Sequence, residues 1–100
     1  MMSALLLPLV EKDLLRLLFR LPGARCLFTD LIEKCREWKV SSWSDYNEID
    51  DKVERFIINH LTELEYVYYL STDNNGLCLY LSQRGRWAVK TVIGTEFGAN

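Results

Sequence analysis

The hydrophobic spacing of this chain changes from helical to alternating at Glu65. Before it, apolar residues recur at helical intervals over residues 49–64, as in a helix with one buried face. After it, two runs rich in β-forming residues, 66–70 and 77–81, flank a segment that tolerates positive φ, 73–76. A long helix followed at once by a β-hairpin is the feature that most restricts the fold.

The long helix carries a capping pattern at its start. Asp45 stands three residues before Glu48, so each carboxylate can accept a hydrogen bond from the other residue's backbone N–H. Behind this pair, the inward spacing is kept by Ile49, Val53, Phe56, Ile57, Leu61 and Leu64. We therefore expect a helix over residues 45–64.

Two shorter helical patterns precede the long helix. The first has Pro8 in its first turn and ends at Leu21-Pro22-Gly23, because proline cannot continue a helix and glycine readily adopts positive φ. The second covers residues 29–38, with Thr29 as its N-cap. Its inward positions are Phe28, Leu31, Ile32, Cys35 and Trp38. The pattern breaks over residues 40–44.

A two-residue turn within residues 73–76 sets the expected hairpin register. Even-numbered residues of the first strand then face odd-numbered residues of the second. The expected core face comprises Tyr68, Leu70, Thr72, Leu77, Leu79 and Leu81, whereas Tyr69, Cys78 and Tyr80 point the other way. A short last helix containing Trp87, Ala88 and Val92 follows and ends at Gly94.

Length and composition indicate one α+β domain. The chain has 100 residues, of which 49% are hydrophobic and 26% charged, so we expect a single domain over residues 1–100 with a core at about 8–94. The apolar opening ends at Glu11, too early to span a bilayer. Cys26, Cys35 and Cys78 cannot all pair and form no C-x-x-C motif, which favours buried thiols in the cytoplasm.

The order of helix, helix, turn, longer helix and hairpin resembles a winged helix-turn-helix domain of the MarR-like and PadR-like bacterial transcriptional regulators. The motifs that carry the resemblance are Leu61-x-x-Leu64-Glu65 and Leu81-Ser82-Gln83-Arg84-Gly85. The resemblance covers residues 10–93 and implies three helices, a hairpin wing and a short C-terminal helix, with DNA binding in transcription regulation. The chain lacks these families' glycine after the long helix and their basic hairpin tip.

Catalytic and metal-binding patterns are missing from the sequence. His60 is the only histidine and lies on the apolar side of the long helix, where a structural role is expected. The adjacent carboxylates Asp50 and Asp51 diverge on a helix by about 100°. The glycines form no phosphate-binding loop. We therefore expect no enzyme activity, metal or cofactor.

The charge pattern bears on nucleic-acid binding in two ways. Helix-turn-helix docking puts the start of the long helix in the major groove. Residues 45–55 hold five carboxylates and two cations, a net charge of minus three, which repels phosphates. The basic cluster beside Trp87 consists of Arg84, Arg86 and Lys90. It either contacts phosphate or is simply the solvated start of the last helix. The candidate DNA contacts are Ser44, Tyr46, Asn47, Lys52, Arg84, Arg86 and Lys90.

Two functions therefore stay open. One is a transcriptional regulator that binds double-stranded DNA, which the family resemblance favours. The other is a winged-helix protein-interaction or dimerisation module whose acidic recognition helix does not bind DNA, which the local charge favours. The chain's net charge of minus two also lacks the basic excess typical of DNA-binding domains.

Apolar residues near the N-terminus exceed what one helical face can bury. They are Leu5, Leu6, Leu7, Leu15 and Phe19. Contiguous exposed apolar surface usually marks an interface, so we expect a homodimer through these residues. The alternative is that they cover the monomer's own core.

Overall fold

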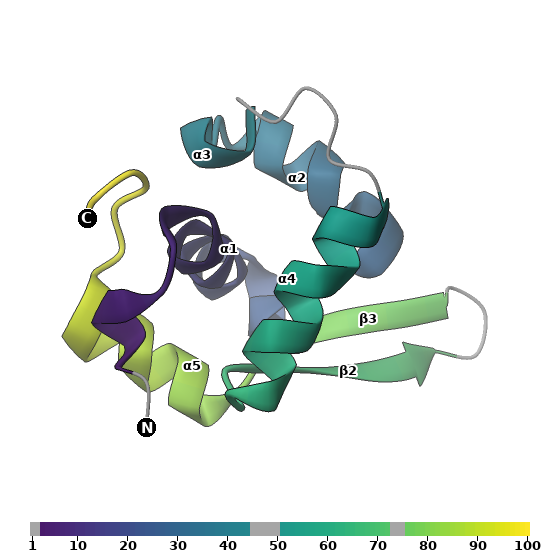
Figure 1. Ribbon diagram of the computed structural model, residues 1–100. Helices are drawn as coiled ribbons and strands as arrows, with labels where there is room; N and C mark the ends of the chain where they lie inside the picture. Colours follow the sequence, from purple (N-terminus) through teal and green to yellow (C-terminus); the bar gives the residue numbers. More distant parts are fainter. Residues whose placement is uncertain (1–2, 45–50, 73–75) are drawn as a thin grey trace.

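The helical and alternating patterns fold into an α+β structure. The computed structural model describes residues 3–44, 51–72 and 76–100. Within these ranges, five α-helices and several short 3-10 or π-helical turns accompany one three-stranded antiparallel sheet of order β1-β3-β2 (Figure 1). Among the helices of these ranges, none is both long and apolar enough to cross a bilayer.

Helix α1 (Leu9–Arg20) ends where predicted and begins just after Pro8, which was expected in its first turn. Pro8 occupies the N-cap, Leu21 is the C-cap, and Gly23 just beyond it has φ +70°. Pro22 and Gly23 end the helix as expected, because proline blocks its continuation and glycine takes the left-handed conformation without strain. Every residue from 11 to 18 is buried, including the charged ones.

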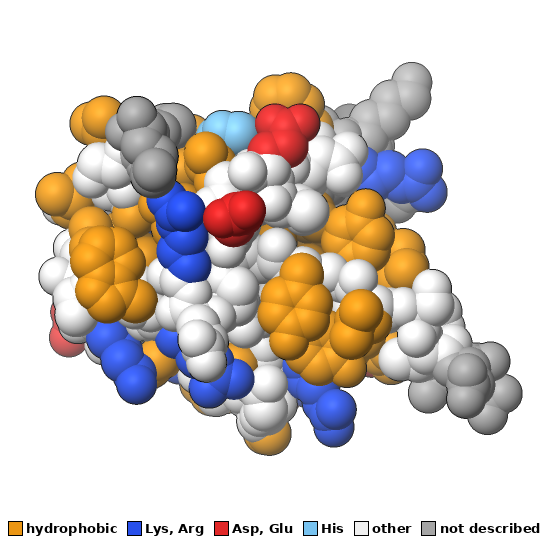
Figure 2. Space-filling view, turned by 90° about the horizontal axis from the view of Figure 1, so that it is seen from below, with side chains coloured by type: hydrophobic (Ala, Val, Ile, Leu, Met, Phe, Trp, Pro, Cys, Tyr) orange, Lys and Arg blue, Asp and Glu red, His pale blue; other side chains and the backbone are white. Residues whose placement is uncertain are grey.

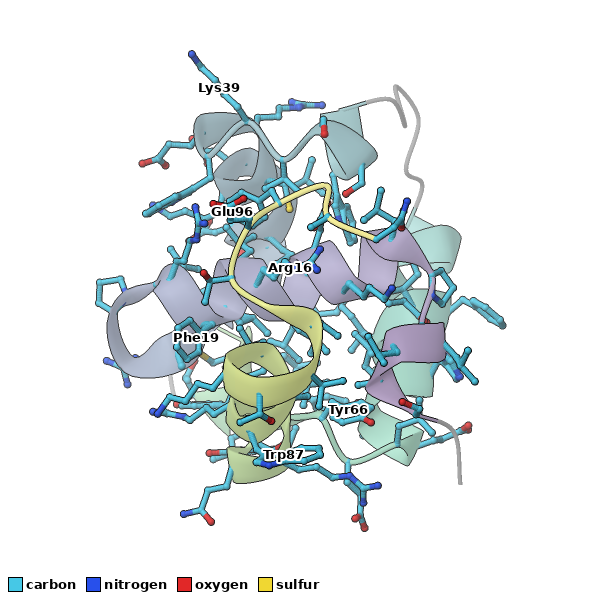
Figure 3. All side chains as sticks on the ribbon, turned by 90° about the vertical axis from the view of Figure 1, so that its left-hand side faces the viewer. Arg16, Phe19, Lys39, Tyr66, Trp87 and Glu96 are labelled. Atoms are coloured by element: carbon cyan, nitrogen blue, oxygen red, sulfur yellow. The ribbon has the colours of Figure 1, made fainter. Side chains whose placement is uncertain are left out.

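The buried charges of α1 bind other parts of the chain. Asp13 accepts hydrogen bonds from Arg16 at 2.8 Å, from the Ser42 hydroxyl at 2.5 Å and from the Gly98 N–H at 3.1 Å. Arg16 also donates to backbone carbonyls within residues 93–99. Figure 3 shows Arg16 on α1 next to this C-terminal segment. The ion pair therefore fastens the C-terminal segment over α1.

Burial of α1 corrects the expected dimer surface. Leu7 and Leu15 are buried in the chain's own core, and Phe19 is partly buried against it. Leu7, Leu15 and Phe19 thus belong to the monomer's own core, which was the alternative to a dimer surface. Leu5 and Leu6, in the 3-10 turn η1 (Ala4–Leu6), are exposed. Homodimer formation itself stays a prediction.

A short strand that the sequence analysis did not predict follows α1. Strand β1 (Arg25–Leu27) pairs antiparallel with β3, with Cys26 opposite Leu79. The 3-10 turn η3 (Phe28–Asp30) then leads into helix α2 (Leu31–Glu37). Because helical geometry already begins at η3, the prediction of Thr29 as N-cap is wrong.

The two helices after β1 bury only part of the predicted face. Leu31 and Cys35 of α2 are buried as expected, but Trp38 is 39% exposed because α2 ends before it. Lys39 then has φ +53°, and the chain forms the short helix α3 (Ser41–Ser44) where no helix was expected. All three cysteines of the chain are buried, as predicted.

Helix α4 (Asp51–Glu63) is the predicted long helix. The capping pattern expected at residues 45–48 lies outside the described residues. Ile57, Ile58 and Leu61 are buried, whereas Phe56 is 74% exposed instead of facing the core. The spacing therefore identified the helix correctly but misplaced its buried face, which is centred closer to Ile58.

The chain leaves α4 through Glu65, which has φ +65°. Its N–H donates to the Thr62 carbonyl and the Tyr66 N–H donates to the Leu61 carbonyl, both at 3.0 Å. This pair of hydrogen bonds is a Schellman motif, in which glycine usually takes the left-handed position. Glu65 thus occupies the left-handed position in which glycine is usual.

The predicted hairpin is formed by β2 (Val67–Thr72) and β3 (Gly76–Leu81). Its register differs from the expectation, because Thr72 pairs with Gly76 and three residues separate them. An odd loop length pairs even with even residues, so Tyr68 faces Tyr80 and Leu70 faces Cys78.

The corrected register changes which first-strand residues face the core. On the inner face, Val67, Leu79 and Leu81 are buried. Leu79 and Leu81 were predicted there correctly. The prediction was wrong for Tyr68, Leu70 and Thr72, which lie on the opposite face. Tyr68 and Leu70 are exposed there.

The last helix begins immediately after β3. Helix α5 (Gln83–Ala88) continues as the π-helical turn η4 (Val89–Ile93), and Gly94 with φ +79° ends it as predicted. The Ser82 hydroxyl caps α5 by accepting from the Gly85 N–H at 3.0 Å. Gly85 packs so closely on the backbone of Tyr66 that any side chain would collide with it. These contacts give the Ser-x-x-Gly motif a physical role.

Candidate nucleic-acid interface

One cation of the basic cluster pairs with a carboxylate, and the other two are exposed. Arg84 lies 3.4 Å from the Glu65 carboxylate, and its guanidinium lies 5.5 Å from the centre of the Tyr66 ring. Arg84 therefore braces α5 against the end of α4. Arg86 and Lys90 are exposed.

Arg86 and Lys90 flank an exposed tryptophan. They are four residues apart, so they lie on the same side of the helical segment. Trp87, 56% exposed, sits at the outer end of α5 in Figure 3. A shallow pocket of about 320 Å³ is lined by these three residues with Gln83 and Thr91. No Asp or Glu is among these described lining residues, so the pocket is electropositive.

The other candidate DNA contacts are not part of the described lining of this pocket. Ser44 is the last residue of α3, and Lys52 falls in the first turn of α4. Tyr46 and Asn47 lie outside the described residues. The structure thus brings together Arg86 and Lys90, whereas Arg84, Ser44 and Lys52 are not among the described residues that line this pocket.

The described hairpin residues carry no charged side chains. Tyr68, Tyr69, Leu70 and Leu77 are all at least 40% exposed. Figure 2 shows hydrophobic side chains gathered over this part of the molecule, with basic side chains around them. A partner that contacts the described hairpin residues therefore meets no charged side chain there.

Sequence reasoning missed a row of residues on the outer face of the sheet. This outer face is the one that carries Arg25, Tyr80 and Tyr68. Arg25 of β1 lies opposite Tyr80 of β3, which lies opposite Tyr68 of β2. The row could not be found without β1, whose three residues are too few to give an alternating signal.

His60 is engaged in a contact between helices. Its Nδ1 lies 2.5 Å from the Oε1 atom of Glu11, a carboxylate that is 4% exposed. The contact joins α4 to α1, in agreement with the structural role expected for this histidine.

No protein-family model matches this chain, and no curated protein or solved structure is significantly similar to it.

Proposed function

We propose that this protein is a winged-helix domain that binds double-stranded DNA through α5 and the neighbouring hairpin. The order of α1, α2, α4, the hairpin and α5 supports the winged-helix assignment. Pairing of β1 with β3 supports it further, since this pairing joins the hairpin to the helical part of the domain.

One observation carries the DNA-binding proposal. Arg86 and Lys90 are exposed on either side of Trp87, and the described lining of their pocket holds no carboxylate. Exposed cations that are not neutralised by neighbours provide the counterion release that drives binding to duplex DNA. An adjacent indole adds apolar contact with the sugar-phosphate backbone.

The acidic start of α4 is far enough from Arg86 and Lys90 to let DNA approach α5. Arg84, at the start of α5, contacts Glu65, which follows the C-terminal end of α4. Figure 1 shows α5 beyond that end of α4 and away from its start. The 13 residues of α4 span about 20 Å. This exceeds the screening length of about 8 Å at physiological ionic strength, so repulsion from the start of α4 is weak at α5.

Fluorescence anisotropy with labelled mixed-sequence duplex DNA tests the proposal. Binding should weaken steeply with salt, and the double substitution Arg86→Gln and Lys90→Gln should lower the slope of log K against log salt by about 1.8. The matched control is Arg36→Gln with Lys39→Gln, which removes the same charge from an exposed region of α2 and its C-terminal turn. Figure 3 places Lys39 at the opposite end of the molecule from Trp87.

The control variant should bind as the wild type does. If no saturable duplex binding occurs at about 50 mM salt, or if both double variants lose the same affinity, the DNA-binding proposal fails.

A protein-interaction module is the second candidate, and the hairpin surface favours it. The exposed side chains of Tyr68 and Leu70 on the outer face of the hairpin, and of Tyr69 and Leu77 on its inner face, carry no charge. Aromatic residues are enriched at protein interfaces, where they supply large buried areas. Under this proposal, duplex DNA does not bind and Leu70→Lys abolishes association with the protein partner.

A further inference from the structure

The outer face of the sheet holds an aromatic pair. The rings of Tyr68 and Tyr80 are stacked, with centroids 5.2 Å apart and planes inclined by 6°. Tyr68 is 43% exposed and Tyr80 is partly exposed. The stack supports the Tyr80 ring on its β2 side. The opposite side of the same ring points along the row toward Arg25.

A cleft of about 420 Å³ lies on that opposite side. Its lining includes all three residues of β1, Cys78 and Tyr80 of β3, and Thr72 at the end of β2, but not Tyr68. Leu21 and Pro22 at the end of α1 also line it, as do Asp30 and Lys34 from the next helical segment. Its volume falls within the range of small-ligand sites, about 300–1,000 Å³.

The cleft combines an aromatic wall with two cations. Arg25 is exposed, and its side chain runs back along Gly23, where an added Cβ would touch it at 3.4 Å. Lys34 donates a hydrogen bond to Glu37 at 3.1 Å. This bond and the charge of Glu37 raise the pKa of Lys34, so its ammonium stays charged. Asp30 is the one carboxylate in the described lining, and Glu37, which pairs with Lys34, lies outside that lining.

We propose that this cleft binds an unstacked nucleobase together with its phosphate. The base stacks on the Tyr80 ring, and Arg25 and Lys34 contact the phosphate. Stacking on an aromatic side chain beside cations is how proteins hold single-stranded nucleic acids. A base within a duplex is already stacked on its neighbours, so the ligand is a single strand or a free nucleotide.

The ligand site is separate from the proposed duplex-binding surface. The described lining of the cleft does not include Arg86, Trp87 or Lys90. The two activities can therefore be lost independently. This inference goes beyond the duplex-binding function and stands if that function fails.

Anisotropy with a fluorescein-labelled oligothymidine of about twelve nucleotides tests the proposal. Tyr80→Leu removes the stacking ring and should raise the Kd about 5- to 100-fold. Tyr80→Phe keeps the ring and should bind within about twofold of the wild type, which separates stacking from folding defects. Tyr69→Leu is the matched control, because Tyr69 is similarly exposed on the inner face of the same hairpin.

A second pair of variants tests the phosphate contact. Arg25→Gln should lower the salt slope for the oligothymidine by about 0.7, whereas Arg36→Gln should leave it unchanged. Adenosine monophosphate, titrated into 15N-labelled protein, distinguishes the two ligand sources. Shifts of the Arg25 and Tyr80 amide signals indicate a free-nucleotide site, and their absence alongside oligothymidine binding indicates a single-strand site.

The proposal is overturned if neither probe binds, or if Tyr80→Leu and Arg25→Gln bind oligothymidine as tightly as the wild type. Saturation of the cleft by an apolar peptide but by neither nucleotide probe also overturns it and supports a protein interface. Loss of oligothymidine binding only in the Arg86→Gln and Lys90→Gln variant overturns this inference but leaves the α5 surface in place. Oligothymidine binding at Tyr80 without duplex binding supports this inference and contradicts the proposed function.

Discussion

Replacing Gly85 with alanine tests how α5 is held against the hairpin. A Cβ atom at this position would lie 2.3 Å from the backbone oxygen of Tyr66 and 2.5 Å from Cδ1 of Leu81. The Tyr66 oxygen cannot easily retreat, because it accepts a hydrogen bond from the Ser82 N–H at 3.0 Å. Leu81 is itself buried in the core.

The expected change in the free energy of unfolding follows from three contributions. Helix propensity favours alanine over glycine by about 1 kcal/mol. Overpacking of a close contact costs about 1–3 kcal/mol, and weakening the hydrogen bond between Ser82 and Tyr66 costs about 1 kcal/mol more. Gly85→Ala should therefore destabilise the protein by about 1–3 kcal/mol, the opposite sign to propensity alone.

Urea denaturation followed by circular dichroism measures this loss. In thermal denaturation, the Tm should fall by about 4–8 °C for each kcal/mol of lost stability in a domain of this size. Arg86→Ala is the control, since it introduces alanine at the next, exposed position of α5 and should change stability by less than about 0.5 kcal/mol. If Gly85→Ala is as stable as the wild type, the close packing of Gly85 against Tyr66 is refuted.

Three further stability predictions use the same denaturation assay. Leu79→Ala should cost about 2–5 kcal/mol because it leaves a cavity beneath the sheet, and a loss below about 1 kcal/mol would contradict its burial. Gly76→Val should cost about 1–2 kcal/mol because Gly76 has φ +79°, and Ser71→Val at an exposed position of β2 is the comparison that lacks this strain. Asp13→Ala should cost about 3–5 kcal/mol because it leaves the buried Arg16 without its carboxylate, and equal stability would show that the ion pair is dispensable.

The sequence alone determined the elements whose signals are local. Helix α1 ends at Pro22 and Gly23 because those residues restrict or release the backbone wherever they occur. Helix α4 and the hairpin follow from hydrophobic period, which depends only on near neighbours. The clustering of Arg86 and Lys90 beside Trp87 was also readable, since residues three or four apart on a helix are always close.

Tertiary structure decided which faces are buried. Period-two alternation cannot identify the inner face of a hairpin, because one residue more or less in the loop reverses the pairing. The three residues between Thr72 and Gly76 therefore put Tyr68 and Leu70 on the outer face. Similarly, α1 is buried over residues 11–18 in the folded chain, where Arg16 holds the C-terminal segment against the helix.

The outer-face row depended entirely on long-range pairing. Arg25 lies 55 residues before Tyr80 in the sequence, yet the two are opposite each other across β1 and β3. Three residues form a strand only when a neighbouring strand supplies hydrogen-bonding partners, so no local pattern marks β1. The sequence thus determined α1, α4, the hairpin and the basic side of α5, and the pairing of β1 with β3 created the cleft beside Tyr80.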